Sequence, residues 1–229
     1  MGKNILIVAA TDLELKPLLS NMKFETISGS NMKRATLENN KIDILITTIG
    51  MVATTHKLTR TLCSHKYDYV INAGICGAFN TSFQLGDVVN VVNEVFAELA
   101  VDGNDGLSPI KLGASLGDEM LTISIHNENP ISTPSLQNLK KVKGVTVNTI
   151  SGNKKRIDYF RKMYAPDVES MEGAAFLYVC NAMNQPCTQI RSISNHIGNP
   201  DRNDWNIELA VNNLAKVILR IINELEKIN

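Results

Sequence analysis

Short hydrophobic runs recur along the chain, separated by polar or glycine-containing stretches. Continuous apolar runs of this length, bounded by turn residues, are typical of strands that are buried on both faces of a sheet. The pattern predicts strands at 4–10, 41–48, 68–73, 86–95, 145–150 and 188–194. Gly74 and Gly77 follow the third of these segments, and we expect them to end that strand.

Helical periodicity lies between the predicted strands. Thr11 or Asp12 can cap a helix after the first strand, and 52–63 predicts a second helix after Gly50. The clearest helix is C-terminal, where an apolar stripe with helical spacing comprises Leu214, Val217, Ile218, Ile221, Ile222 and Leu225. The alternation of strands and helices predicts the α/β class: one domain over residues 1–229 with three α/β/α layers and a mixed, largely parallel central sheet.

Residues 99–140 interrupt this alternation and carry many of the glycines and prolines of the chain. We predict loops there, with a short strand at 121–125. Long loops inside a compact domain often serve as lids or binding loops.

The composition excludes several classes of protein. Hydrophobic residues make up 44% of the chain and charged residues 20%, which suits a sizeable core and argues against disorder. Lys+Arg and Asp+Glu both total 23, so no excess of positive charge indicates a nucleic-acid partner. No apolar run approaches the roughly 20 residues of a membrane helix, and no signal-peptide pattern is present. We expect a cytoplasmic protein with neither a nucleic-acid nor a membrane partner.

The cysteines and histidines give no sign of a metal site. The four cysteines, at positions 63, 76, 180 and 187, form no CxxC pair, and the four histidines lack metal-ligand spacing. The chain also contains neither GxGxxG nor GxxxxGK[ST], so no dinucleotide or triphosphate loop is indicated. We expect neither a metal nor another cofactor.

Four polar stretches follow a predicted strand or open a predicted helix: AATDLE, NAGICGAF, ESMEGAAF and SISNHIGN. Ligands of open α/β sheets bind at the carboxyl ends of the strands, so these stretches are the candidate site. Each also has an ordinary reading. The acids of VESMEGAAF can simply lie at a helix start, where the macrodipole favours negative charge. Glu14 can be a solvated carboxylate on a helix, and the GxxG segment can be a simple chain reversal. Asn195 and His196 can be loop residues, and Arg191 a structural ion-pair partner.

The four stretches, in this order, resemble the nucleoside phosphorylase and nucleosidase superfamily over nearly the whole chain. Within it the chain most resembles the futalosine hydrolases, through FAELAVDGNDG, GVTVNTISGN, VESMEGAAFLYVC and RSISN followed by RNDWNI. The resemblance implies a nucleoside phosphorylase-like fold, cleavage of an N-glycosidic bond, a small-molecule nucleoside substrate and a homodimer or larger homo-oligomer.

The resemblance also implies roles for individual residues. Met171 would pack on the ribose, Glu172 would accept hydrogen bonds from its hydroxyls, and Glu14 would activate water as a general base. Glu169 corresponds to a second acid of related nucleosidases, but the spacing differs by one residue, which leaves its role open. Further substrate contacts are implied for Gly74, Ile75, Cys76, Gly77 and Ser194.

Two departures refine the predicted reaction. The related phosphorylases bind phosphate with arginines near the first strand and before the glycine turn, whereas no arginine precedes Arg34 here. Water is then the expected acceptor. Adenine-releasing relatives carry Asp where this chain has Asn195, whose amide suits a 6-oxopurine, although an amide can flip. The expected reaction is hydrolysis of futalosine to hypoxanthine and dehypoxanthine futalosine, a step of menaquinone biosynthesis.

The benzoate arm of futalosine would require a cation, and the surroundings of the arm stay open. The candidate cations are Lys154, Lys155, Arg156 and Arg202, and the candidate stacking surfaces are Trp205 and Phe79, either of which can equally be core. Three alternative functions remain: a methylthioadenosine/S-adenosylhomocysteine nucleosidase, a purine nucleoside phosphorylase, and a non-catalytic nucleoside-binding protein.

Overall fold

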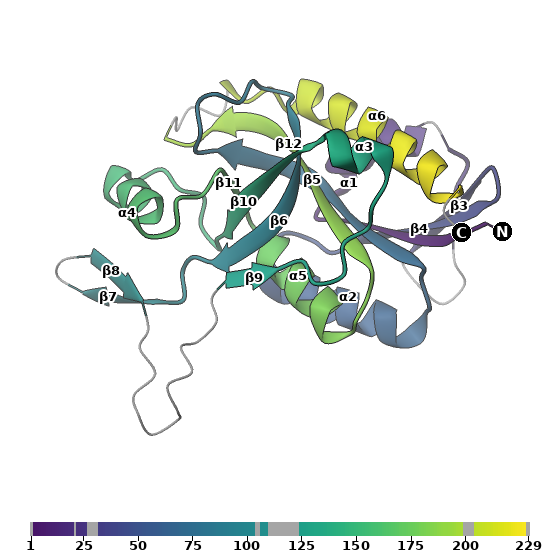
Figure 1. Ribbon diagram of the computed structural model, residues 1–229, viewed down its shortest axis with the longest axis horizontal. Helices are drawn as coiled ribbons and strands as arrows, with labels where there is room; N and C mark the ends of the chain where they lie inside the picture. The colour runs from purple at the N-terminus through teal and green to yellow at the C-terminus, as the bar shows by residue number, and fades with distance from the viewer. Residues whose placement is uncertain are drawn as a thin grey trace.

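The computed structural model describes residues 2–20, 22–26, 32–103, 106–109, 124–198 and 204–227. Its centre is a ten-stranded mixed sheet (Figure 1). From edge to edge the strands are β11 (Val168–Ser170), β10 (Lys140–Thr146), β6 (Val88–Phe96), β12 (Cys187–His196), β5 (Tyr69–Ala78), β1 (Asn4–Ala9), β4 (Asn40–Ile46), β3 (Lys33–Leu37) and β2 (Glu25–Thr26). The tenth strand, β9 (Ser124–His126), pairs with β6.

The sheet closes on itself at one end. β11 pairs with β10 in parallel and with β5 in antiparallel orientation. Since β10, β6, β12 and β5 are successive neighbours, these five strands form a closed ring. The other strands continue from β5 as an open sheet, in which β1 runs parallel to both β5 and β4.

Helices cover both faces of the open sheet, which confirms the predicted three-layer α/β/α class. One face carries α1 (Asp12–Ser20), α6 (Ile207–Leu225) and the short α3 (Pro134–Asn138) (Figure 1). The opposite face carries α2 (Met51–Ser64) and α5 (Gly173–Ala182). The remaining helix in the described part of the chain, α4 (Lys154–Tyr164), lies at the end where the strands form the ring.

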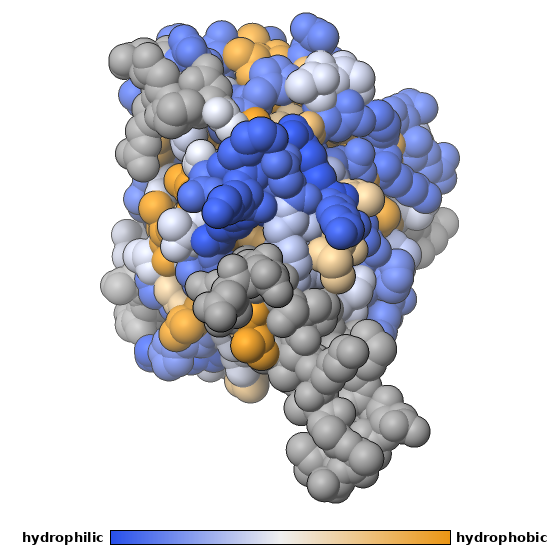
Figure 2. All heavy atoms as spheres, turned by 90° about the vertical axis from the view of Figure 1, so that its left-hand side faces the viewer, coloured by the Kyte–Doolittle hydropathy of each residue, from blue (hydrophilic) through white to orange (hydrophobic). Residues whose placement is uncertain are grey.

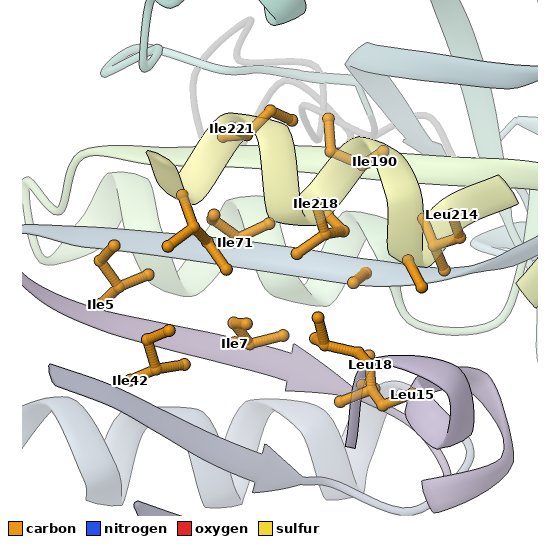
Figure 3. Packing of buried hydrophobic residues seen from close by; sticks show 14 of the residues in the cluster. Ile5, Ile7, Leu15, Leu18, Ile42, Ile71, Ile190, Leu214, Ile218 and Ile221 are labelled. Carbon is orange, nitrogen blue, oxygen red and sulfur yellow. The ribbon is translucent and has the colours of Figure 1, made fainter. Parts of the chain in front are cut away.

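The largest hydrophobic cluster explains why the C-terminal helix forms. Between the sheet and α6 lie the side chains of Ile5 from β1, Ile71 from β5 and Ile190 from β12 (Figure 3). Leu214 and Ile218 of α6 belong to the same hydrophobic cluster. The apolar stripe predicted for this helix is therefore its buried face. Full burial of each such side chain contributes roughly 1.5–3 kcal/mol, so the stripe anchors the helix on the sheet.

The glycines at the end of β5 do not end the strand as predicted. β5 continues through Gly74 and Gly77 to Ala78 because β12 pairs with it along its whole length. The glycines are instead positions where other side chains approach the strand closely. A Cβ at Gly77, for example, would overlap the side chain of Ile197.

One further prediction at this end of the sheet is corrected, and one strand was missed. The strand predicted at 145–150 is β10, Lys140–Thr146, whose three lysines made its first half look unlike a buried strand. Lys140 and Lys141 are exposed, whereas residues 144–146 are all buried, so only the second half of the strand has the pattern of a buried strand. Strand β11 was not predicted, since three residues give too little pattern.

The segment 99–140 contains more regular structure than the predicted loops. β7 (Ala100–Gly103) and β8 (Gly106–Pro109) form a two-stranded hairpin, and β9 and α3 follow. β9 overlaps the strand predicted at 121–125, of which residues 121–123 lie outside the described residues, as do 104–105 and 110–120. Among the described helices, none combines the length and the apolar character that crossing a membrane requires.

Candidate active site

A cavity of about 370 Å³ opens where β1, β5 and β12 end. These strands are parallel, so their carboxyl ends meet at one edge of the sheet, where ligands of α/β folds bind. The structure brings nearly all the predicted site residues together here: the lining includes Glu14, Ile75, Cys76, Gly77, Met171, Glu172, Ser194 and Asn195. Gly74 lies directly behind this wall, and Glu169 is part of the lining.

Glu14 lies in the first turn of α1, with its carboxylate directed back over the end of β1. Oε2 accepts hydrogen bonds from the backbone N–H groups of Ala10 and Thr11, each at 3.0 Å. Oε1 accepts one from the N–H of Ile75 in β5 at 3.1 Å. Thr11 immediately precedes α1, so the hydrogen bond from its N–H to Glu14 is the one that an acid in the first turn makes in a capping box. Glu14 is only 7% exposed, so the reading of a solvated helix face is wrong.

The surroundings of Glu14 raise its pKa. Burial is the largest cause of the shift, and the charge of Glu172 adds to it. The charge of Arg191 and the N–H groups of Ile75 and Thr11 lower the pKa without cancelling the effect of burial. A carboxylate with a raised pKa takes up a proton more readily than a solvated one, which is what a general base requires.

Glu172 is the N-cap residue of α5, yet its side chain makes no bond to its own helix. Oε1 accepts a hydrogen bond at 3.0 Å from the N–H of Gly50, the N-cap residue of α2. Oε2 lies 3.9 Å from Nη2 of Arg191. The α2 macrodipole and the guanidinium both stabilise its negative charge. The helix-start reading of VESMEGAAF is correct for the position of Glu172 and wrong for Glu169, which lies in β11. The side chain of Glu172 nevertheless bonds to the start of another helix, α2.

Arg191 is the functional candidate that sequence reasoning undervalued. It is 1% exposed, and its Nε and Nη2 atoms have no hydrogen-bond partner among the described residues. The residue opposite it in β5 is Gly74, and a Cβ there would overlap the guanidinium and lie 2.7 Å from Oε1 of Glu14. Arg191 therefore pairs with Glu172, as an ion-pair reading expects, and also lies beside Glu14. The signal in the sequence was the glycine that makes room for it.

A buried polar network supports the start of α5. Glu94 of β6 accepts hydrogen bonds from Nε2 of Gln189 at 2.6 Å and from Oγ1 of Thr146 at 2.9 Å. A Cβ at Gly173 would lie 2.7 Å from Cδ of Glu94, which explains why this helix begins with small residues. Burial raises the pKa of Glu94 to about 7. Glu94 was not predicted because a polar residue in a strand usually indicates a solvent-facing position.

The amide of Asn195 has a defined orientation at the end of β12. Nδ2 is 3.4 Å from the carbonyl oxygen of His196, which can only accept a hydrogen bond. Oδ1 therefore faces the hydroxyl of Ser194 at 2.9 Å, and this hydroxyl, which has one proton, also lies 3.2 Å from the carbonyl oxygen of Cys76. The second N–H of Nδ2 remains for a ligand. Asn195 thus offers the cavity a hydrogen-bond donor.

The remaining walls of the cavity are largely apolar. Met171 is partly exposed in the lining, beside Ile150 and Ile197. Leu13 and Ile49 also contribute to the lining and are 51% and 59% exposed, so they mark its mouth. In the described part of the chain, no group of three or more His, Cys, Asp or Glu side chains is arranged to hold a metal ion.

Residues 4–223 match the family described as the phosphorylase superfamily. The chain belongs to the phosphorylase superfamily. Curated relatives include a 5′-methylthioadenosine/S-adenosylhomocysteine nucleosidase of Bacillus subtilis, 29% identical over 91% of this chain and 92% of the relative. A futalosine hydrolase of Thermus thermophilus is 26% identical over 96% of this chain and 95% of the relative. Both relatives are nucleosidases, which supports the predicted N-glycosidase class.

Solved structures confirm the phosphorylase-superfamily fold. A Helicobacter pylori methylthioadenosine nucleosidase mutant with 5′-methylthioadenosine in its active site has a TM-score of 0.80 at 21% identity, over 98% of this chain and 100% of that one. The futalosine hydrolase of the same organism has a TM-score of 0.78 at 19% identity, and the match covers 97% of this chain and 98% of that one. Structures of both enzyme types are therefore similar to this fold, and the fold does not distinguish their substrates.

Three of the four basic residues proposed for a benzoate arm are not part of the described cavity lining. Figure 2 looks onto the end that carries α4, and the centre of this face is hydrophilic. Lys154 and Lys155 are exposed there, and Arg156 forms an ion pair with Glu98. None of the three is among the described lining residues. Arg202 lies outside the described residues.

The two aromatic candidates have different environments. Trp205 lines the cavity. Phe79 is 5% exposed and packs in a hydrophobic cluster with Phe160. The Arg161 guanidinium lies 6.0 Å from its ring centroid. Phe79 does not belong to the described lining, so its core reading holds and the stacking role is dropped.

Replacing Gly74 by alanine tests the contact between β5 and the buried charges. We expect the free energy of unfolding to fall by about 1–3 kcal/mol, because the added Cβ overlaps Arg191 and Glu14. Gly152→Ala is the matched control, since Gly152 is exposed and a Cβ there meets nothing within 4 Å. Urea unfolding measures both variants, and equal stability of the two would contradict the described contact.

Proposed function

We propose that this chain is a nucleosidase that hydrolyses the N-glycosidic bond of futalosine, releasing hypoxanthine and dehypoxanthine futalosine. One observation carries the proposal: the carboxylates of Glu14 and Glu172, from distant parts of the chain, line the same cavity. The nucleosidase relatives support the reaction type, and the orientation of Asn195 supports a 6-oxopurine as the base.

Glu14 is the proposed general base. Its Oε1 accepts one hydrogen bond, from Ile75, so it retains a lone pair for a water molecule in the cavity. The water loses a proton to Glu14 as its oxygen attacks C1′ of the ribose. The bond from C1′ to the purine breaks, and the purine leaves with the bonding electron pair. The proton taken up by Glu14 is passed on to the purine, which restores the carboxylate and yields hypoxanthine. Arg191 lies beside both carboxylates, and its positive charge stabilises the ionised form of Glu14 before the proton is taken up.

Glu172 is the proposed ribose ligand. A carboxylate can accept hydrogen bonds from two hydroxyl groups, and such charge-assisted bonds are stronger than neutral ones. Its negative charge also stabilises the positive charge that develops on the sugar while the glycosidic bond opens. Met171, next to it in the lining, offers a polarisable thioether to the face of the sugar.

The described cavity favours water over phosphate as acceptor. None of its described lining residues is Lys or Arg. Arg34, the first arginine of the chain, bonds to the buried carboxylate of Asp43 at 2.6 and 2.7 Å and is therefore already paired. Arg191 is within reach of the site, but two carboxylates flank it and oppose the approach of a phosphate dianion.

The orientation of Asn195 favours a 6-oxopurine. Its free N–H can donate to O6 of hypoxanthine, and only this contact discriminates, because N7 is an acceptor in both bases. A 6-aminopurine carries donors at position 6, so the same N–H would face them there. An unmatched buried polar group costs about 1–3 kcal/mol, which is enough to set a preference.

A methylthioadenosine/S-adenosylhomocysteine nucleosidase is the second candidate. Relatives of this kind support it, and so do the apolar side chains of Leu13 and Ile49 at the mouth, which suit an alkylthio group. The described lining offers no Lys or Arg for the carboxylate of futalosine. The base released therefore decides between the two candidates.

We also propose that the protein forms a homodimer or a larger homo-oligomer. Val52 of α2 and Tyr178 of α5 are 83% and 57% exposed on one side of the sheet, where a second copy could cover them. Light scattering of the purified protein measures the assembly directly.

The decisive experiment is product analysis by chromatography. The protein is incubated with futalosine, inosine and 5′-methylthioadenosine, each with and without inorganic phosphate. We expect hypoxanthine from futalosine at a rate that phosphate does not change, and slower cleavage of the other two. Predominant release of adenine would establish the second candidate, and a requirement for phosphate would establish a phosphorylase.

A further inference from the structure

Helix α5 begins without a bond from the side chain of its own N-cap residue. That residue is Glu172, whose Oε1 accepts from the N–H of Gly50 and whose Oε2 faces Arg191. An N-cap side chain ordinarily accepts the N–H of the second or third helical residue, and a buried N–H without an acceptor is costly. The second residue of α5 is Ala174, which is fully buried. Another group therefore has to accept the N–H of Ala174.

Thr146, the last residue of β10, accepts this N–H. Its Oγ1 lies 2.7 Å from the backbone nitrogen of Ala174. The hydroxyl has one proton, which it donates to Oε2 of Glu94 in β6 at 2.9 Å. The N–H of Gly173, the first residue of the helix, bonds to the hydroxyl of Ser170 at 3.2 Å. Thr146 thus takes the place of an N-cap side chain, although it belongs to a strand of the central sheet.

Glu94 fixes the direction of the Thr146 hydroxyl. It is fully buried against the start of α5, where a Cβ at Gly173 would overlap its carboxylate. Its Oε1 accepts from Nε2 of Gln189 at 2.6 Å, which leaves Oε2 for the hydroxyl. A carboxylate can only accept, so the Thr146 proton points to Glu94 and a lone pair of Oγ1 faces Ala174. An ionised acceptor also polarises the hydroxyl and strengthens the bond that this hydroxyl accepts.

We propose that Thr146, held by Glu94, is a positioning residue that keeps the carboxylate of Glu172 in the cavity, because it occupies the N–H of Ala174 that this carboxylate would otherwise cap. The inference rests on the proposed role of Glu172 as the ribose ligand and names residues that act through it. Neither Thr146 nor Glu94 is among the described lining residues. Their effect on a bound nucleoside therefore passes through Glu172.

Loss of the Thr146 hydroxyl would leave the N–H of Ala174 buried without this acceptor. Glu172 directly precedes α5, and an N-cap carboxylate can turn to the N–H of the second helical residue. Turning there would break its bond from Gly50 and move its negative charge away from Arg191. The N–H groups of Gly50 and Ala174 are donors of the same kind, so the carboxylate would be divided between them. A bound ribose would then lose part of its ligand.

The test is a double-mutant cycle of Thr146→Val and Glu172→Gln. Valine keeps the shape of the threonine side chain and removes its hydroxyl. We expect Thr146→Val to lower kcat/KM for futalosine by roughly tenfold in the wild type, and by less than about threefold in the Glu172→Gln background. Thr146→Ser keeps the hydroxyl and should stay within about threefold of the wild type. Equal losses in the two backgrounds would overturn the proposal, because Thr146 would then not act through Glu172.

Thr188→Val is the matched control. Thr188 is also a buried threonine of the sheet, and its hydroxyl donates to Oδ1 of Asn90 at 3.3 Å. This bond joins β12 to β6 and does not involve α5. We expect both valine variants to be less stable in urea, since each leaves a buried polar group without its partner, but only Thr146→Val to lower kcat/KM. A comparable loss of kcat/KM in the control would overturn the specific role of Thr146.

Glu94→Gln keeps the proposal testable if Thr146→Val does not fold. The new amide oxygen can still accept from Thr146. Its NH₂ group can donate to Oε1 of Gln189 once that amide turns over, since this oxygen has no hydrogen-bond partner among the described residues. The variant removes the charge that polarises the Thr146 hydroxyl, so we expect kcat/KM to fall by about threefold, and not to fall in the Glu172→Gln background. A loss that persists in that background would overturn the proposal.

Hydrogen exchange of the Gly50 amide separates this inference from the proposed reaction, because it requires no turnover. In the wild type this N–H is bound by Glu172, and it loses that protection whenever the carboxylate turns to α5. We expect the Gly50 amide to exchange roughly tenfold faster in Thr146→Val than in Thr188→Val. If no nucleoside is cleaved, the proposed reaction fails, while the exchange rate still decides whether Thr146 positions Glu172. Equal exchange rates in the two variants would overturn that role.

Discussion

Glu14→Gln is expected to lower kcat by roughly 10³-fold and to leave substrate affinity within a few-fold of the wild type. General base catalysis contributes about 10²–10⁴-fold to a rate, and an amide cannot take up the proton of the attacking water. Ligand contacts made by Met171, Glu172 and Asn195 are unaffected by this change. Single-turnover kinetics combined with equilibrium binding separates the two quantities, and a variant with more than a tenth of the wild-type kcat would remove Glu14 from the mechanism.

The structural cost of Glu14→Gln can be measured separately. The amide oxygen can still accept from Ala10 and Thr11, but the NH₂ group would then face the N–H of Ile75. We expect a lower melting temperature for this reason, and binding measured well below that temperature isolates the effect on chemistry. A non-catalytic nucleoside-binding protein would retain its affinity in this variant and have no turnover to lose.

The pH dependence of the wild-type enzyme follows from the same group. A general base acts in its ionised form, so kcat/KM should rise with pH as Glu14 loses its proton. Because burial raises the pKa of Glu14, this rise should lie above the pH range of a solvated glutamate. The rise should be absent from the residual activity of Glu14→Gln.

The sequence predicted those parts of the fold that local pattern determines. The apolar stripe of α6 and the continuous apolar run of β1 need no information about neighbours, and both are found where they were predicted. β5 was ended too early, because its continuation through Gly74 depends on pairing with β12 and on the arginine that fills the space. Pairing and filling are tertiary effects that glycine in a single sequence does not reveal.

In the candidate site, too, some residues could be predicted from local sequence and others depend on tertiary contacts. Glu14, Glu172 and Asn195 could be proposed because each follows a strand or opens a helix, and parallel strands bring their carboxyl ends together. Arg191 and Glu94 could not be assessed from sequence, since only the folded protein reveals that both are almost fully buried. For Glu169 the resemblance left the role open, and only the folded protein shows that it is buried in the wall of the cavity.

Glu172→Gln is expected to lower kcat/KM by on the order of 100-fold, through the loss of charge-assisted bonds to the ribose and of a charge that stabilises the sugar cation. The fold should be kept, because an amide oxygen can still accept from the N–H of Gly50. Steady-state kinetics on futalosine measures the loss, with the melting temperature as the control for folding. A change smaller than threefold would mean that Glu172 only anchors the start of α2.

The same variant should also change the pH profile, because the charge of Glu172 acts on Glu14. The charge of Glu172 raises the pKa of Glu14, and the charge of Arg191 lowers it. Removing the negative charge abolishes the first effect and leaves Arg191 without its ion-pair partner, so both changes lower the pKa of Glu14. The rise of kcat/KM with pH should therefore move to lower pH in Glu172→Gln. A shift to higher pH, or none, would show that the two carboxylates do not interact through the cavity they line.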